Sequence, residues 1–591
     1  MKTKSLLITL GHNSSAIFVN GDNVIGYEQE RLSGIKADSQ FPVNAINEII
    51  HNVGINEVLG CNAFISHWFD HDAKAPYEFR PSKYMKKKDY DFLRAICCDI
   101  KFVDANFTHH DAHAYSAMAF FNYFYEGEPA MVAKQVYTIV ADGFGTNQEV
   151  VSIYESHYDK DTAPKLIHRV HGYECSLGLM YQYATSFCNM KENQDEYKFL
   201  GYEAHILDCF DAPVVETLDS YIKSLSDMLL NMAEENTKPI CGKTGEIDTH
   251  ELSNVKQFWH RQFADITSSL DIEGDAEHDY TFKLRVAVAY LIQGIIENYF
   301  VSLVSAYNMS NVICVGGCFY NVKLNNAILE NTDGLFSVMP LAGDQGAAIG
   351  MYSKFTGKQF PFHTLAIGKR RLHNIAKNLP QNAFYRPVTD SHSLEAAADE
   401  IANKIANGNI VNLIYGNMEF GPRALCNTST LMLPTAENVA ATNHMNSRNE
   451  VMPCAPVCSS NFVASLFNEE ELCRVIGSDM FMICTHTYTK DYSLQYAGVM
   501  HRKPICFDQE YTGRPQIVHP SSFMGFVLRR VNEICDAKCI VNTSFNVHGR
   551  PIAFDTTEIL QNFEYQYEHA KEGKKPLLYI VEIPESCLNN E

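Results

Sequence analysis

The same strand–turn–strand layout occurs twice in the first 160 residues, and this repeat constrains the fold more than any other feature. In the first copy, over 5–29, a β-prone run enters a polar glycine-bearing turn, and Asn20-Gly21 then predicts a tight hairpin. In the second copy, over 136–154, the turn Ala141-Asp142-Gly143-Phe144-Gly145 separates two β-prone runs. Two such hairpins predict two half-domains that face a shared cleft, where backbone N–H groups can bind an anion. A pair of ordinary hairpins is an equal alternative at this point.

Hydrophobic periodicity predicts helices and strands beyond these hairpins. Apolar residues at helical spacing predict a helix over 43–53, which Gly54 ends, and a longer amphipathic helix over 284–306. The strand-like run 312–315 is followed by a glycine turn and by a helix that begins near Asn321. This alternation of strands and helices is typical of an α/β fold.

The chain has 591 residues, which is too long for one hydrophobic core, so we expect at least two domains. Pro, Gly, His and Lys are enriched over 355–390, and a predicted helix and strand follow. We interpret this stretch as a domain junction. The expected division is one domain over 1–360, a junction over 361–390 and a second α/β domain over 391–591.

Charge and composition narrow the classes of partner. The chain has 48 Lys and Arg against 70 Asp and Glu, a net charge of −22, which disfavours broad binding of nucleic acid but not a local phosphate pocket. No apolar run approaches the ~18 residues of a membrane span, and no signal peptide is recognised. The 18 cysteines form neither a disulfide framework nor a zinc pattern. We therefore expect a reduced, cytoplasmic protein without membrane contact.

His109 and His113 are four residues apart at the start of a predicted helix. Both imidazoles then project from one face and can share a metal ion, with Asp111 as a candidate residue to orient them. In a chain with 23 histidines, this spacing alone favours chance over a metal site. The glutamate of an HExxH motif is missing, which excludes a zinc protease of that class.

Two aspartates strengthen the metal interpretation. Asp142 and Asp344 each follow a predicted strand and stand beside glycines. A carboxylate in that position projects beyond the strand ends, where open α/β sheets bind ligands. With the two histidines, they make a mixed nitrogen and oxygen set that suits iron, manganese or zinc. Simple capping of turns or helices is the alternative role for both.

The C-terminal part carries three spaced arginines, Arg423, Arg448 and Arg514, and the flanking loops contain glycine or proline. A guanidinium group held in such a loop can bind a phosphate or carboxylate through two hydrogen bonds. A turn rich in Asn, Thr and Ser follows at 541–546. Together these features predict a polyphosphate pocket, and it is not a P-loop because no GxxxxGK[ST] motif is present.

Taken together and in order, these motifs resemble those of the carbamoyltransferase family, which includes nodulation-factor and antibiotic-tailoring O-carbamoyltransferases. The N-terminal motifs are GHNSSA (11–16), ERLSGIKADSQFP (30–42), HHDAHA (109–114), ADGFG (141–145), SLGLMYQYATSF (176–187), NQDEYKFLG (193–201), GGCFYNVKLN (316–325) and AGDQGAAIG (342–350). The C-terminal motifs are MEFGPRAL (418–425), TGRPQ (512–516) and NTSFN (542–546). The resemblance covers nearly the whole chain.

The resemblance implies two domains with separate tasks. The N-terminal domain would have the actin-like, duplicated α/β fold of the tRNA-threonylcarbamoyl transfer proteins, and the C-terminal domain a YrdC-like α/β fold. The C-terminal domain would make carbamoyl-adenylate from carbamoyl phosphate and ATP with Mg²⁺, releasing pyrophosphate. The N-terminal domain would pass the carbamoyl group to the hydroxyl of a small acceptor. We also expect a homodimer.

The resemblance also implies roles for single residues. In the family, iron as Fe²⁺ (or another divalent metal) binds the adenylate phosphate, and the matching ligands are His109, His113, Asp142 and Asp344. The adenylate-contacting segment matches Gly316, Gly317 and Asn321. Catalytic roles are expected for His12, which is a candidate general base, and for Lys36, Arg423 and Arg448. Nucleotide binding is expected for Arg514, Asn542, Ser544 and Asn546.

One segment departs from the family pattern, because Asn446 stands where a lysine is usual and Met452 where a second arginine is usual. Two lost charges are expected to weaken phosphate binding, by roughly 1–3 kcal/mol per charged hydrogen bond. The candidates to compensate are Arg502, Arg529 and Arg550. Two alternatives stay open: a transferase that adenylates a different small carboxylate, and a nucleotide-binding regulator with a decayed C-terminal domain. The acceptor can be an antibiotic, a sugar or a hydroxymethylated nucleotide or nucleic acid.

Overall fold

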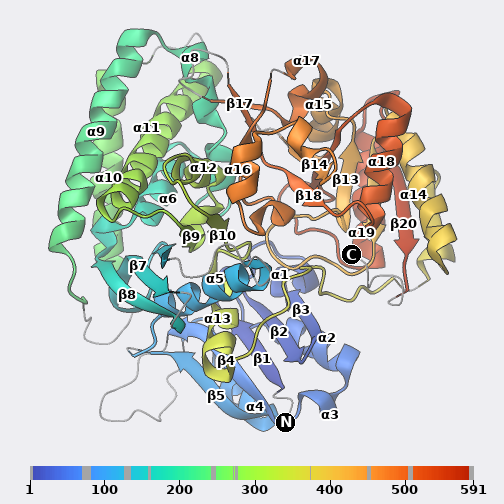
Figure 1. Cartoon of the computed structure of the whole chain (residues 1–591), viewed down its shortest axis with the longest axis horizontal. Helices are drawn as coiled ribbons and strands as arrows, with labels where there is room; N and C mark the ends of the chain where they lie inside the picture. The colour runs from blue at the N-terminus through green and yellow to red at the C-terminus, as the bar shows by residue number, and fades with distance from the viewer. Residues whose placement is uncertain are drawn as a thin grey trace.

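The structure is a computed structural model that describes residues 4–68, 82–104, 106–125, 135–157, 161–240, 248–270, 272, 277–372, 374–377, 379–448, 451, 454–490, 492–503 and 510–584. Met452 lies outside the described residues. Within them the chain forms two five-stranded sheets, one seven-stranded sheet and one three-stranded sheet (Figure 1). The expected α/β class is confirmed.

The first five-stranded sheet has the order β3-β2-β1-β4-β5. Its strands are β1 (Ser5–Thr9), β2 (Ser15–Asn20), β3 (Asn23–Glu28), β4 (Cys61–Trp68) and β5 (Cys97–Val103). The first three run antiparallel, and β4 and β5 run parallel to β1. The predicted Asn20-Gly21 hairpin joins β2 to β3, and Gly21 has the positive φ of 66° that such a turn needs. The predicted helix over 43–53 is α2 (Val43–Val53).

The second five-stranded sheet repeats this topology, with the order β10-β9-β6-β7-β8. Its strands are β6 (Gln135–Ala141), β7 (Glu149–His157), β8 (Asp161–His171), β9 (Val312–Val315) and β10 (Phe336–Val338). Again the first three strands are antiparallel, and the last two run parallel to the first. The repeat seen in the sequence is therefore a duplication of the whole sheet, as the actin-like fold requires.

Two helices, α5 (His109–Tyr125) and α13 (Asp344–Thr356), lie between the two sheets (Figure 1). They approach so closely that a Cβ atom at Gly350 would lie 1.8 Å from the carbonyl oxygen of Ala112, so only glycine fits there. Each helix begins at a predicted metal ligand, His109 in α5 and Asp344 in α13. The close packing of these helices therefore places the two side chains beside each other.

Long helices cover the outer side of the second sheet, namely α9 (Ala212–Glu235), α10 (Thr249–Ser269) and α11 (Glu277–Ala306) (Figure 1). The predicted helix over 284–306 is the C-terminal part of α11. By length and composition α11 is apolar enough to cross a membrane, but 72% of its most apolar window is buried inside the protein. Its apolar surface thus belongs to the core around Trp259 and Phe263 of α10.

The C-terminal region, from β11 to β20, is built on the seven-stranded sheet, in the order β11-β20-β12-β13-β19-β14-β18. These strands are β11 (Ala383–Pro387), β12 (Val411–Tyr415), β13 (Thr428–Met432), β14 (Ala455–Ser459), β18 (Gln516–Val518), β19 (Cys539–Ser544) and β20 (Leu577–Glu582). Leu413 packs with α14 (Ser391–Ala406) and α18 (Phe523–Cys535), whereas Ile414 packs with α19 (Thr556–His569). Because successive strand residues point to opposite faces, helices cover both faces.

The C-terminal region is joined to the N-terminal region, which runs from β1 to α13, by backbone pairing. The amide of Ile476 donates to the carbonyl oxygen of Phe336 on β10, at 2.9 Å. The hydroxyl of Ser478 accepts from the Val338 amide at 2.7 Å and donates to its carbonyl oxygen at 3.0 Å. A segment of the C-terminal region therefore extends the edge of the second N-terminal sheet and fixes the two regions against each other.

Candidate active site

The first turn of α5 presents two imidazoles to one point. The Nε2 atoms of His109 and His113 lie 3.0 Å apart. Nδ1 of His109 lies 3.2 Å from the carbonyl oxygen of Ser66, so in the neutral ring a proton on Nδ1 donates there and the Nε2 lone pair can bind a metal ion. Asp111 does not orient these rings, because its carboxylate accepts from the hydroxyl of Tyr154 and from Arg169. The Ser66 carbonyl has the orienting role that the sequence suggested for Asp111.

The two predicted aspartates complete this cluster. Asp142 follows β6, and its Oδ2 lies 3.4 Å from Nε2 of His109 and 3.5 Å from Nε2 of His113. Oδ1 of Asp344 lies 3.2 Å and 3.7 Å from the same two nitrogens. One ligand atom from each residue falls within a group whose members are all within 4.8 Å of one another. The four side chains can therefore hold a metal ion.

The geometry and charge of the cluster fit a divalent cation. For metal–ligand bonds of about 2.1 Å, donors at adjacent corners of an octahedron or tetrahedron lie about 3.0–3.4 Å apart, close to the separations found here. Burial raises the pKa of Asp142, but hydrogen bonds from His109 and His113 outweigh burial and hold it at about 2. Two ionised carboxylates in a largely buried site need a cation between them, which a metal supplies.

Glycines bring backbone close to the metal cluster. Gly316 has φ 105°, and a Cβ atom there would lie 2.0 Å from the carbonyl oxygen of Ala141. At Gly317 a Cβ atom would lie 2.9 Å from Oδ1 of Asp142. Asn321 caps the following helix, α12 (Val322–Glu330), by accepting hydrogen bonds from its first amides. The strand–glycine–helix motif thus presents backbone and a helix N-terminus next to the candidate metal ligands, an arrangement suited to an anion.

One cavity of about 1130 Å³ joins this cluster to the C-terminal region. From the N-terminal region, the predicted site residues in its lining are His12, Lys36, His109, Asp142, Gly317, Asn321 and Asp344. From the C-terminal region, they are Arg423, Arg448, Arg514, Asn542, Ser544 and Asn546. His113, which is fully buried, and Gly316 lie behind the surface of this cavity. The structure therefore brings together in one space residues that are up to 534 positions apart in the sequence.

Arg448 forms a polar unit with the NTSFN turn at the C-terminal end of the cavity. Its guanidinium group donates to the hydroxyls of Thr543 and Ser544, at 2.6 Å and 2.8 Å, and to Oδ1 of Asn546, at 2.8 Å. The segment spans the C-terminal end of β19, with Thr543 and Ser544 in its last positions and Asn546 just beyond it. Fixed donors at a strand end, beside an arginine, suit the binding of phosphate groups.

Arg423 lines the cavity at a contact between the two regions. Its Nη2 is 3.5 Å from the carbonyl oxygen of Tyr320, and its buried Nε has no hydrogen-bond partner among the described residues. Burial lowers the pKa of Arg423, and no carboxylate among the described residues forms an ion pair with it. A buried guanidinium without a counter-ion is costly unless an anion binds beside it. This position is therefore a candidate anion site.

Asn446 does not contribute to the cavity. Its side chain is fully buried, and its Oδ1 accepts a hydrogen bond from Nε2 of Gln566 at 2.7 Å. Asparagine at this position was expected to remove a positive charge from the phosphate site. The side chain instead lies in the interior of the protein, outside the cavity.

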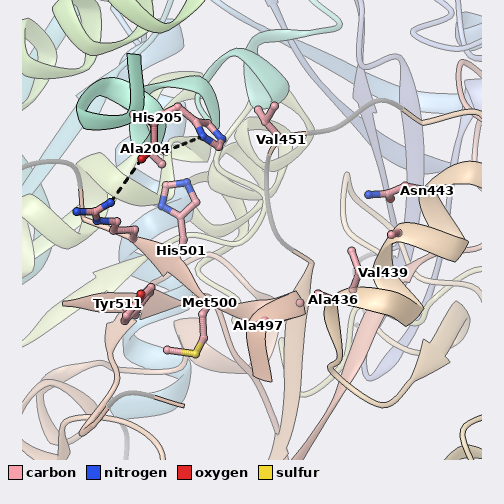
Figure 2. Close-up of a pocket in the computed structure, with 14 residues that line it drawn as sticks. Ala204, His205, Ala436, Val439, Asn443, Val451, Ala497, Met500, His501 and Tyr511 are labelled. Carbon is pink, nitrogen blue, oxygen red and sulfur yellow. Dashed lines mark hydrogen bonds and ion pairs between the residues drawn. The ribbon is translucent and has the colours of Figure 1, made fainter. Parts of the chain in front are cut away.

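The three arginines considered as replacements for lost charge lie elsewhere. Arg529 and Arg550 are exposed and absent from the cavity lining. Arg502 lines a separate pocket of about 370 Å³ on the outer side of the boundary between the regions, where it lies 3.7 Å from Asp208. Figure 2 shows that pocket, with His205 and His501 on one side and Val439 and Asn443 on the other. None of the three arginines compensates inside the shared cavity.

Some lining residues were missed in the sequence. Helix α10 contributes Thr249, Ser253 and Lys256, and the end of the first sheet contributes His67. No local motif marks α10, because its side chains reach the cavity only through the way α10 packs on α6 (Leu177–Phe187). Sequence motifs identify residues that lie next to glycine turns in the chain. The α10 residues and His67 do not lie next to such a turn.

Comparison with known proteins agrees with this geometry. Residues 82–352 match the family model described as the carbamoyltransferase N-terminus, and 402–569 match the carbamoyltransferase C-terminus. An uncharacterised protein of Methanocaldococcus jannaschii is 25% identical over 582 residues, which cover 94% of this chain and 95% of that protein. The 3'-hydroxymethylcephem-O-carbamoyltransferase of Amycolatopsis lactamdurans is 29% identical over 198 residues, 32% of this chain and 36% of that protein.

A solved structure also shows similarity. Full-length HypF, in its phosphate- and nucleotide-bound form, is 13% identical, with a TM-score of 0.29, and the match covers 59% of this chain and 54% of HypF. The two family models match in chain order and together cover most of the sequence, with the four-residue cluster and the glycine motif inside the first match and Arg448 inside the second. The chain therefore belongs to the carbamoyltransferase family.

Proposed function

We propose that this protein is an ATP-dependent O-carbamoyltransferase, which makes carbamoyl-adenylate from carbamoyl phosphate and transfers its carbamoyl group to an acceptor hydroxyl. The observation that carries this proposal is the single cavity between the Arg448 cluster and the metal-binding cluster. A carbamoyl group is a poor electrophile because its nitrogen donates into the carbonyl, so it needs a good leaving group such as AMP. A shared cavity lets that reactive intermediate pass between the two ends with limited exposure to water.

In the first reaction, water hydrolyses carbamoyl phosphate to carbamate and inorganic phosphate. A carbamate oxygen then attacks the α-phosphorus of ATP, and the bond to the pyrophosphate leaving group breaks. Arg448 and Arg514 bind the phosphate groups of the donor and of ATP, which enters with Mg²⁺. Arg423, which has no carboxylate partner in the described part of the chain, neutralises the adenylate phosphate.

In the second reaction, the acceptor oxygen attacks the carbonyl carbon, and the bond between that carbon and the AMP oxygen breaks. His12 takes the hydroxyl proton as general base, and Lys36 lines the same space. Gly317 and Asn321 orient the adenylate. A divalent ion, Fe²⁺ by analogy with the family, held by His109, His113, Asp142 and Asp344 would supply positive charge to the AMP phosphate.

The placement of Asn446 outside the cavity favours carbamoyl phosphate as the donor over a different small carboxylate. Asn446 and Met452 were the two grounds for a decayed C-terminal region, and the buried placement of Asn446 removes the first of them. The acceptor is an antibiotic, a sugar or a hydroxymethylated nucleotide, and the cytoplasmic location and the homodimer remain predictions.

The test is to incubate the full-length protein with ATP and carbamoyl phosphate and to measure pyrophosphate and AMP. Pyrophosphate release that requires carbamoyl phosphate supports the proposal. If the protein carries a divalent metal ion and still releases no pyrophosphate, the proposal is contradicted. A screen of hydroxyl compounds for a mass increase of one carbamoyl group then identifies the acceptor.

A further inference from the structure

Gln293 is a buried polar residue in the middle of α11, a helix whose other buried side chains are apolar or aromatic. It is 2% exposed. A buried side-chain amide costs free energy unless its hydrogen bonds are made, so a glutamine at this position needs partners. The partners of Gln293 therefore indicate its role.

Gln293 pairs with Asn321, the residue that follows the glycine motif. Nδ2 of Asn321 donates to Oε1 of Gln293 at 2.8 Å. In return, Nε2 of Gln293 lies 3.3 Å from Oδ1 of Asn321. Asn321 lines the shared cavity, and Gln293 lies in the protein interior. Gln293 thus holds the Asn321 amide from behind the cavity wall.

The orientation of each amide is also fixed by a second set of partners. Oδ1 of Asn321 accepts from the backbone amides of Lys323 and Leu324, at 3.2 Å and 3.0 Å, in the first turn of α12. Nε2 of Gln293 donates to Oε1 of Glu297 at 2.6 Å, one turn further along α11. A flip of either amide would place a nitrogen where an acceptor is needed, or an oxygen where a donor is needed. The pair therefore has one favoured arrangement, with Nδ2 of Asn321 against Oε1 of Gln293.

This arrangement leaves one N–H group of Asn321 for a ligand. A side-chain amide nitrogen carries two hydrogens, and Gln293 accepts one of them. Among the described residues, Gln293 is the one acceptor for Nδ2 of Asn321. Asn321 shares the cavity lining with Gly317, whose backbone lies close to Asp142. The second N–H group is thus a preset donor on the wall of the transfer site, and a preset donor loses little entropy when a ligand binds.

Close packing fixes the part of α11 that carries Gln293. A Cβ atom at Gly294 would lie 2.5 Å from Cδ1 of Ile222 on α9, so the two helices approach closely there. Ile292 and Ile295 are fully buried on either side. A residue on such a rigid element can hold a neighbouring side chain in one position.

We infer that Gln293 is a positioning residue of the adenylate site, which orients the Asn321 amide so that its second N–H group faces the ligand. This inference rests on the proposed function, in which Asn321 orients the adenylate. It extends the site to a residue that lies behind the cavity wall. The hydrogen-bonded chain from Glu297 through Gln293 to Asn321 then links the core of the N-terminal region to the ligand.

The test measures AMP binding to the full-length protein, with a divalent metal ion present, by titration calorimetry. Gln293→Met keeps the length of the side chain and removes its hydrogen-bonding groups. We expect it to raise the Kd for AMP by about 3- to 10-fold, the usual effect of one lost neutral hydrogen bond. Asn321→Ser keeps a capping hydroxyl for α12 and removes the amide, with a similar expected rise in Kd. In the double variant, Gln293→Met should add nothing to Asn321→Ser, because it acts through that amide.

Asn311→Ala is the matched control for the loss of a buried amide. The Asn311 side chain donates to the carbonyl oxygen of Gln135 at 3.0 Å and accepts from the Leu335 amide at 2.9 Å. It is buried and absent from the cavity lining. This variant should lower the melting temperature and leave the Kd for AMP unchanged.

Three results overturn the inference: a wild-type protein that does not bind AMP, an unchanged Kd in Gln293→Met, or an effect of Gln293→Met that persists in the Asn321→Ser background. Pyrophosphate release by the same samples, with ATP and carbamoyl phosphate, tests the proposed function separately. If AMP binding follows the expected pattern and no pyrophosphate is released, the proposed function is contradicted and the role of Gln293 is supported. If pyrophosphate is released and the two substitutions act independently on AMP binding, the proposed function is supported and the inference is overturned.

Discussion

Arg423 of the C-terminal region lies with its Nη2 atom 3.5 Å from the carbonyl oxygen of Tyr320 in the N-terminal region. Tyr320 immediately precedes Asn321, which caps α12 beside the metal cluster. Arg423 therefore brings a guanidinium group of the C-terminal region against the N-terminal wall of the cavity that Arg448 and His109 also line. An adenylate made at one end and used at the other would pass this guanidinium group.

We expect Arg423→Ala to lower activity without lowering stability. Removal of one charged hydrogen bond to phosphate is expected to reduce kcat/KM by about 10- to 100-fold. The buried guanidinium has no counter-ion among the described residues, so its removal should leave the melting temperature unchanged or higher. Carbamoyl transfer assays and thermal melts check both parts, with the exposed Arg529→Ala as control. A large loss of stability with unchanged kinetics would contradict the anion-site role.

Metal binding should depend on the four-residue cluster. His109→Ala and Asp344→Ala each remove one of four ligands, and we expect at least about a 10-fold loss of affinity for a divalent ion. Metal content after dialysis, measured by mass spectrometry, checks this without an activity assay. His51→Ala, an exposed histidine on α2, is the control. Equal metal content in all variants would show that the ion binds elsewhere.

Asn446→Lys should not create a better donor site. The Asn446 side chain is fully buried against Gln566, so a lysine there places an ammonium group in the core, at a cost of several kcal/mol. We expect a lower melting temperature and no decrease in the KM for carbamoyl phosphate. His444→Lys is the control, at an exposed position in the last turn of α15 (Ala436–Met445), the helix that Asn446 caps. A gain in carbamoyl phosphate turnover by Asn446→Lys would instead place this position in the site.

The free energy of unfolding should fall as pH rises from about 6.5 to 9, because a buried histidine, His486, loses its proton. Burial lowers the pKa of His486, but the charges of Asp479 and Glu471 and their hydrogen bonds outweigh it and raise the pKa to about 9. Because the folded value exceeds the unfolded value of about 6.5, the stabilisation is complete below pH 6.5 and is lost as pH rises through 9. Urea unfolding across this range measures how steeply the free energy of unfolding falls with pH, and His486→Gln should reduce that slope. An identical slope in that variant would contradict the assignment.

The sequence predicted the parts of this protein that depend on local pattern. β-Prone apolar runs and Asn20-Gly21 predicted the hairpins, and the spacing of His109 and His113 predicted a shared ligand face. The placement of Asn446 could not be predicted, because whether its side chain faces the cavity or Gln566 depends on how α15 packs on α19. The contact of Lys198 with His548 spans 350 positions, and no local pattern records it.

The central claim is that one chain makes carbamoyl-adenylate and keeps it in a cavity shared with the transfer site. The most direct measurement mixes the full-length protein with ATP and carbon-labelled carbamoyl phosphate, separates protein from small molecules by rapid gel filtration, and quantifies label and pyrophosphate. We predict that label stays with the protein as carbamoyl-adenylate in proportion to the pyrophosphate released, and that an acceptor then discharges it. Pyrophosphate without protein-bound label, or no pyrophosphate at all, would contradict the claim.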